Sequence, residues 1–167
     1  MSISMYSAFI PVATRMLGNL SEILAKAEAH CAARQINPGA FLSARIYPDM
    51  FPLTRQVQIA TDMVKGGAAR LAGIEIPRYE DEENSFPQLR ERLDKTVRFL
   101  QAIQPEQIDG KEDAPISLSL RGRQVEFKGE AYLTEYVLPN LYFHVTTAYN
   151  LLRQGGVEIG KRDFLGG

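Results

Sequence analysis

The sequence predicts a mainly all-α fold: an up-and-down four-helix bundle with a short β-hairpin before the last helix. In four segments, apolar residues recur at three- and four-residue steps, which is the period of an amphipathic helix. Residues 116–128 instead alternate apolar and polar side chains, as a strand pair does. The 167 residues, 45% of them hydrophobic, are enough to bury one core. We therefore expect a single domain over residues 1–167.

The first helix is expected from about Ser7 to Arg34. Ser7 is a suitable N-cap, and Pro11 then falls near the first turn, where a missing backbone N–H costs little. Turn-forming residues at 37–39 end the helix. Its apolar stripe consists of Ala13, Leu17, Leu20, Leu24, Ala27 and Cys31. Cys31 is the only cysteine, and its place on the stripe favours a small buried side chain.

The second helix is expected to start between Asp49 and Pro52 and to end at Gly73, which suits a left-handed C-terminal position. Its main stripe consists of Leu53, Val57, Ala60, Val64, Ala68 and Leu71, and Ile59, Met63 and Gly66 lie on the opposite side. A helix that is apolar on two sides is either central in the fold or part of a subunit interface. Because Gly66 and Gly67 would also let another backbone approach closely, we predict a homodimer.

The third helix follows an acidic segment, residues 75–84, which is expected to be a solvated loop. Ser85 and Gln88 have the spacing of a capping box that opens this helix. Its stripe consists of Leu89, Leu93, Thr96, Val97 and Leu100.

The last helix is expected from about Glu130 to Gln154. Pro139 lies inside it and should kink it, because proline removes a backbone hydrogen bond. Residues 157–167 contain several apolar side chains and are expected to fold back over the bundle.

Composition and charge narrow the classes of function. Nineteen basic residues against twenty acidic ones leave a net charge of −1. This balance provides no overall field for nucleic acid or for an anionic membrane surface, so neither is an expected partner. The amino terminus lacks the pattern of a signal peptide, and no apolar run reaches the length of a membrane-spanning helix. A cytoplasmic location fits best.

His144 is the main candidate for a functional side chain. It lies at the centre of the inward stripe of the last helix, where a polar ring needs either a hydrogen-bond partner or a ligand. Asn140, one turn earlier, lies at the edge of this stripe beside the expected kink. His144 is therefore either a hydrogen-bonded core histidine or a contact to a metal or substrate. His30, in contrast, lies off the stripe of the first helix and is expected at the surface.

Candidate partners for His144 lie on the second helix. Gln58 and Asp62 are four residues apart and share one face. They lie well off the apolar stripe of that helix, so a solvated pair is the alternative. The sequence contains no HExxH or CxxC motif, no Gly-rich phosphate loop and no GxSxG elbow. A zinc site usually needs three or four strong protein ligands, and His144 is the one inward histidine expected here.

Four segments resemble an uncharacterised bacterial family, and together they extend over essentially the whole chain. They are Ser-Met-Tyr-Ser at 4–7, residues 48–53 with 56–60, Phe-His-Val-Thr-Thr-Ala-Tyr at 143–149, and Gly-Lys-Arg-Asp-Phe-Leu at 160–165. That family is grouped with the DinB/YfiT-like helical bundles, many of which carry a three-histidine metal site. The resemblance implies a four-helix bundle independently of the hydrophobic periodicity.

The resemblance also assigns positions to the candidate site. In DinB-like proteins the last helix typically shows His-x-x-x-His-Arg-Gly-Gln, followed by Leu-Arg and a glycine. Counted back from residues 152–153, His144 stands at the second histidine and Asn140 at the first, and residues 145–147 replace Arg-Gly-Gln. The histidine that the family supplies from the second helix is also absent, and Asp62 or Gln58 lies in that region.

Two hypotheses about function emerge. In the first, the protein is a dimeric binding or stress-associated protein without catalysis, with a degenerate DinB-like pocket for a small-molecule ligand. In the second, it is a diverged metal-dependent enzyme of the thiol transferase or hydrolase type. His144 would then act as a general base or as a weak ligand of zinc or nickel. The loss of two of the three histidines favours the first hypothesis.

Overall fold

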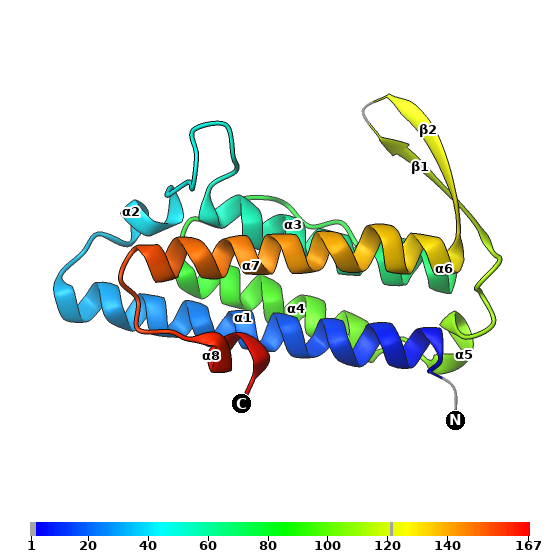
Figure 1. The fold of residues 1–167 in the computed structure, drawn as a ribbon, viewed down its shortest axis with the longest axis horizontal. Coiled ribbons are helices and arrows are strands. Elements are labelled where there is room, and N and C mark those ends of the chain that lie inside the picture. Colours follow the sequence, from blue (N-terminus) through cyan, green and yellow to red (C-terminus); the bar gives the residue numbers. More distant parts are fainter. Residues whose placement is uncertain (1–2, 121) are drawn as a thin grey trace.

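The computed structural model describes residues 3–120 and 122–167, which form mainly helices (Figure 1). The four long helices are α1 (Met5–Arg34), α3 (Leu53–Ala72), α4 (Phe86–Gln101) and α7 (Leu138–Gln154). The short elements are α2 (Pro38–Leu42), α5 (Pro105–Ile108), β1 (Pro115–Leu120), β2 (Arg123–Lys128), α6 (Gly129–Ala131), the π-helical turn η1 (Tyr132–Val137) and α8 (Lys161–Leu165). The predicted mainly helical fold with a hairpin before the last helix is confirmed.

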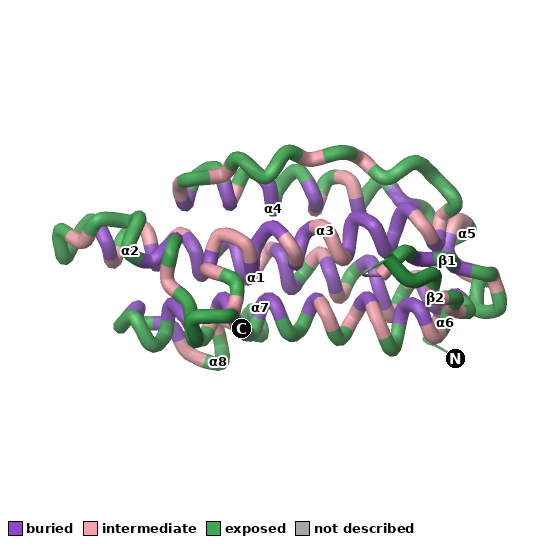
Figure 2. The backbone as a smooth tube through the Cα atoms, turned by 90° about the horizontal axis from the view of Figure 1, so that it is seen from above, coloured by how far each residue is buried: buried purple, intermediate pink, exposed green. Residues whose placement is uncertain are grey.

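The long helices pack so that α1 and α3 each lie between α4 and α7. The relative directions of the four long helices add detail to the predicted up-and-down bundle. Tyr6 at the start of α1 donates its backbone N–H to Asp109, which follows α4, at 2.8 Å. At the same end of the bundle, the end of α3 meets the start of α6, where Leu71 packs on Gly129. The helices α3 and α4 therefore run in the same direction, and residues 73–85, which connect them, return along the outside of the bundle (Figures 1 and 2).

The apolar stripes of the helices meet in one hydrophobic core, and Figure 2 shows the buried residues on the inward sides of the helices. The predicted stripes of α1 and α3 are buried, with exposed fractions of 3% or less. Cys31 is buried as predicted. No helix in the described parts of the chain combines the length and apolarity that crossing a bilayer requires.

The start of α1 differs from the prediction. The helix begins at Met5, because Ser4 is the N-cap and Ser7, three residues later, completes a reciprocal capping box. The hydroxyl of Ser4 accepts from the backbone N–H of Ser7 at 3.2 Å, and the hydroxyl of Ser7 accepts from the backbone N–H of Ser4 at 2.9 Å. Pro11 therefore lies one turn deeper in the helix than predicted, at an exposed position.

The two glycines of α3 make room within the chain. A Cβ on Gly67 would lie 2.8 Å from Val137 of η1 and 3.2 Å from Phe9 of α1. A Cβ on Gly66 would lie 2.6 Å from the guanidinium of Arg70. Side chains of the same chain therefore occupy the space beside Gly66 and Gly67, the two glycines whose lack of side chains suggested a subunit interface.

The predicted irregularity at Pro139 takes the form of the π-helical turn η1. The backbone N–H of Leu138 donates to the carbonyl of Leu133, five residues earlier. Because Pro139 has no N–H and its ring crowds the preceding turn, a wider turn accommodates it.

The hairpin pairs β1 with β2 in antiparallel register, from Pro115 opposite Lys128 to Leu120 opposite Arg123. Gly122 in the turn has a φ of 79°, which favours glycine. Arg121 lies outside the described residues. The chain also ends as predicted: α8 folds back onto α1, where Asn19 donates to the carbonyl of Phe164 at 3.0 Å.

Candidate functional site

His144 lies on the inner side of α7 and is 8% exposed. Its Nδ1 lies 2.7 Å from Oε1 of Gln56 on α3. The amide of Gln56 is itself buried and donates through Nε2 to the carbonyl of Phe51 at 3.0 Å, which turns Oε1 toward the ring. Because an amide oxygen only accepts, Nδ1 of His144 carries the proton and Nε2 carries the lone pair.

The imidazole of His144 is neutral at physiological pH. Burial, followed by the nearby charge of Arg55, lowers its pKa from 6.5 to about 4. Among the described residues, the buried side-chain atoms without a partner are Thr14 Oγ1 and Arg90 Nε, so Nε2 of His144 is not enclosed in the core. The ring of Phe143 lies beside the imidazole and is nearly perpendicular to it, with 5.2 Å between centroids. The site therefore presents one hydrogen-bond acceptor next to an aromatic ring.

Sequence reasoning missed Gln56 as the partner of His144. Gln56 is three residues after Leu53 and four before Ala60, both of which belong to the apolar stripe of α3. A polar residue at the spacing of a buried stripe is the signal that would have identified it.

Asn140 lies one turn before His144, as the helical spacing requires, but its amide is turned to its own helix. Its Nδ2 donates to the carbonyl of Tyr136 at 2.7 Å. Asn140 therefore supports the helix just beyond η1. It makes no hydrogen bond to His144 in the described structure.

Gln58 and Asp62, the predicted partners of His144, belong to a different cluster. Gln58 is buried, donates to Glu83 at 2.8 Å and accepts from Arg55 at 3.2 Å. Asp62 accepts from Arg92 at 2.9 Å and from Lys65 at 3.0 Å. These residues lie off the stripe of α3, so they face α4 and the 73–85 segment instead of α7. They are neither partners of His144 nor a purely solvated pair.

Arg92 of α4 is the centre of this second cluster and is 3% exposed. Its guanidinium donates to the side chains of Thr61, Asp62, Asp81 and Glu83 and to the carbonyl of Glu80, at 2.8–3.1 Å. A buried charge is tolerated only when it is paired and hydrogen-bonded in this way. The acidic segment predicted to be a solvated loop is thus fastened to α3 and α4 by Arg92.

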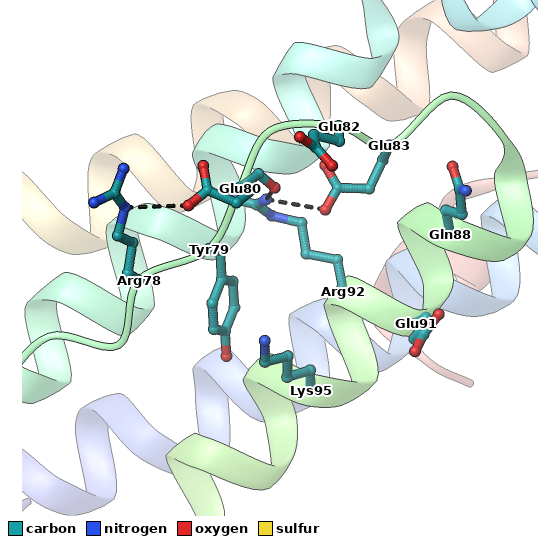
Figure 3. A pocket seen from close by; sticks show the side chains of 9 residues that line it. All are labelled: Arg78, Tyr79, Glu80, Glu82, Glu83, Gln88, Glu91, Arg92 and Lys95. Atoms are coloured by element: carbon teal, nitrogen blue, oxygen red, sulfur yellow. Dashed lines mark hydrogen bonds and ion pairs between the residues drawn. The ribbon is translucent and has the colours of Figure 1, made fainter.

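A cavity of about 380 Å³ lies between this segment and α4 (Figure 3). On its wall, the ring of Tyr79 has the ammonium of Lys65 at 3.8 Å and that of Lys95 at 4.2 Å from its centroid. Burial raises the pKa of Tyr79, so the phenol stays protonated. Glu83 and Arg92, which both line this cavity, form an ion pair with each other. Their ion pair and the contacts of Tyr79 therefore attach residues 73–85 to the bundle.

The residues around His144 do not fit a tight zinc or nickel site. In residues 3–120 and 122–167, no three His, Cys, Asp or Glu side chains are grouped to hold a metal ion. The amides of Gln56 and Asn140 are already hydrogen-bonded. The positive charge of Arg55, which lowers the pKa of His144, also opposes a divalent cation at Nε2.

Comparisons with known proteins agree with this architecture. Residues 5–165 match the family described as "Domain of unknown function (DUF1993)". A crystal structure of a DinB family member protein from Shewanella denitrificans is similar, with a TM-score of 0.87 and 36% sequence identity. The similarity covers 97% of this chain and 92% of that one. A search of curated proteins found no match. The chain therefore belongs to the DUF1993 family, whose fold is that of the DinB-like helical bundles.

Proposed function

We propose that this protein is a non-catalytic binding protein in which His144 accepts a hydrogen bond from a neutral small molecule. The observation that carries the proposal is the neutral imidazole whose Nδ1–H is held by Gln56, so that the lone pair of Nε2 remains for a ligand. Burial of the imidazole favours an uncharged ligand, and the adjacent ring of Phe143 favours an aromatic one. A base with a pKa of about 4 is a weak proton acceptor at neutral pH, which favours binding over general-base catalysis.

One observation favours the alternative, a diverged metal-dependent enzyme of the thiol transferase or hydrolase type. A histidine that donates one ring N–H to a carbonyl oxygen has the orientation of many metal-bound histidines. In this alternative His144 is a weak ligand of zinc or nickel. The bonded amides of Gln56 and Asn140 and the charge of Arg55 weigh against it.

Calorimetric titration with zinc and nickel separates the two functions. We expect wild type, purified without a histidine tag, to show no saturable binding in the micromolar range, and His144→Gln to behave in the same way. Micromolar binding in wild type that disappears in His144→Gln would establish the metal-dependent alternative.

Binding of a neutral donor is tested with phenol and toluene, which share an aromatic ring but differ in the hydroxyl group. We expect phenol to shift the ¹⁵N resonance of His144 Nε2 saturably, and toluene to leave it nearly unchanged. The shift should be absent at Nδ1, which is bonded to Gln56. Equal effects of phenol and toluene on Nε2 would contradict hydrogen bonding at this atom.

The proposal includes a cytoplasmic homodimer; a stress-associated role remains a prediction of the sequence. Large exposed apolar side chains support self-association near His144: Phe143 is 56% exposed, and Phe51, whose carbonyl holds Gln56, is 54% exposed. In sedimentation equilibrium we expect twice the subunit mass of 18.7 kDa. A monomer mass at every concentration would contradict the dimer.

A further inference from the structure

A smaller polar cavity lies under the hairpin, near the opposite end of α3 from Gln56. Its volume is about 160 Å³, and it is lined by Arg70 and Asp62 of α3, by residues 117–120 of β1, and by Tyr132 and Tyr136 of η1. At 1.5 Å per residue, Arg70 lies about 21 Å along α3 from Gln56, and Asp62 lies about 9 Å from it on the face turned to α4. The cavity is therefore separate from the His144 site, and a ligand bound in it would be independent of the function proposed for that site.

Arg70 brings unused hydrogen-bond donors to this cavity. Its Nη1 donates to the hydroxyl oxygen of Tyr132 at 3.1 Å. A guanidinium has five N–H donors, and in the described parts of the chain Arg70 has no other side-chain acceptor and no ion pair. The remaining N–H groups are also not among the buried unpaired atoms, so they face the cavity or solvent.

Tyr132 adds a second donor, and its position is fixed. The side chain is 1% exposed, and its hydroxyl oxygen accepts from Arg70, so its own proton has no acceptor among the described residues. Burial raises the pKa of Tyr132, which keeps this proton on the oxygen. The ring stacks on Tyr136 with 5.8 Å between centroids, and Phe127 packs against both rings.

Gly66 leaves room for the guanidinium of Arg70 beside α3. A Cβ at this position would lie 2.6 Å from Nη1, so the guanidinium, which is the far end of a flexible side chain, would have to move away. The guanidinium therefore lies against α3 at a position where Gly66 has no side chain. The buried helix interior is otherwise an unfavourable position for glycine.

Among the described residues, Asp62 is the one carboxylate that lines the cavity, and its charge is already paired. Its Oδ1 accepts from Arg92 at 2.9 Å and from Lys65 at 3.0 Å. The side of the cavity at Arg70 and Tyr132 thus combines a positive charge with hydrogen-bond donors and lacks an unpaired carboxylate.

We propose that this cavity binds a small oxyanion, held by the guanidinium of Arg70 and the hydroxyl of Tyr132. Charge-assisted hydrogen bonds from arginine suit both phosphate and carboxylate groups. A volume of about 160 Å³ is smaller than the roughly 300–1,000 Å³ of a site for a drug-sized ligand. The cavity therefore suits an anionic group with a few waters.

The test uses NMR titration of the full chain with inorganic phosphate and, separately, with acetate at constant ionic strength. We expect saturable shifts of the backbone amides of residues 117–120 and of the Arg70 side chain with at least one anion, and the tighter one identifies the anion class. Arg70→Gln should weaken this binding at least about tenfold, because it removes a charged donor. Arg15→Gln, at an exposed position of α1, is the control and should leave the affinity unchanged.

Binding of neither anion, or equal affinity in wild type and Arg70→Gln, would overturn the proposal. A second pair of variants guards against a folding defect in Arg70→Gln. Gly66→Ala places a methyl group against the guanidinium, whereas Gly18→Ala makes the same change in α1 with no atom within 4 Å of the added Cβ. Gly66→Ala should weaken anion binding and Gly18→Ala should not; equal affinities in these two variants would also overturn it.

Discussion

Replacing Arg92 with leucine is expected to lower the free energy of unfolding by about 3–5 kcal/mol. The leucine fills part of the space but leaves the carboxylates of Asp62 and Glu83 without their shared cation. The substitution also removes the Nε–H group that donates to the hydroxyl of Thr61 at 2.8 Å. Because Arg92 fastens residues 73–85 to α3 and α4, this segment should detach first, and its amide protons should exchange faster with solvent.

Arg90→Leu is the matched control, since Arg90 lies two residues away on the same helix. Its side chain is 38% exposed, and its ion pair with Glu28 is long, at 4.0 Å. An exposed ion pair contributes about 1 kcal/mol or less. Urea unfolding of both variants, followed by circular dichroism, measures the difference. Similar losses of stability in Arg90→Leu and Arg92→Leu would show that the Arg92 cluster does not hold the segment.

Acidification is expected to destabilise the protein through His144. The pKa of this ring is about 4 in the folded state and 6.5 as the reference value for the unfolded state. Between these values the unfolded state binds the extra proton, so stability falls as the pH is lowered through this window. Above pH 6.5 the neutral ring of His144 makes its full contribution to the free energy of unfolding. Lowering the pH to 4 should reduce that free energy by about 3 kcal/mol.

His144→Gln isolates this contribution. The variant should lose about 1–3 kcal/mol of stability at pH 7, because the buried amide of Gln56 loses its partner. Between pH 6.5 and 4, its stability should fall by about 3 kcal/mol less than that of wild type. Parallel stability curves for the two proteins over this range would contradict a neutral, buried His144.

The elements of the fold are predictable from periodicity because apolar residues recur at helical spacing in each long helix and alternate with polar ones in the hairpin. The directions in which the helices run are not predictable from periodicity. The segment 73–85 has enough residues, at up to about 3.3 Å each, to return along the whole of α3, which is about 30 Å long. Acidic composition alone predicted a solvated loop, since the sequence pattern does not show that Arg92 would be buried beneath it. The position of Arg92 between Leu89 and Thr96 on the stripe of α4 is the signal that was missed.

For the candidate site, the stripe of α7 predicted correctly that the ring of His144 faces inward. Which residue of α3 meets the ring of His144 depends on the rotation of α3 about its own axis. Gln56 and Gln58 are two residues apart and therefore point in very different directions on a helix. Only the packing of α3 against α7 and α4 determines which of the two amides meets the imidazole.

The central claim is that His144 is neutral, with its proton on Nδ1 and its lone pair on Nε2. A pH titration of the ¹⁵N resonances of its imidazole tests this most directly. The structure predicts the Nδ1–H tautomer at neutral pH and a titration midpoint near a pKa of about 4. An Nε2–H tautomer, or a midpoint at or above the reference value of 6.5, would contradict it.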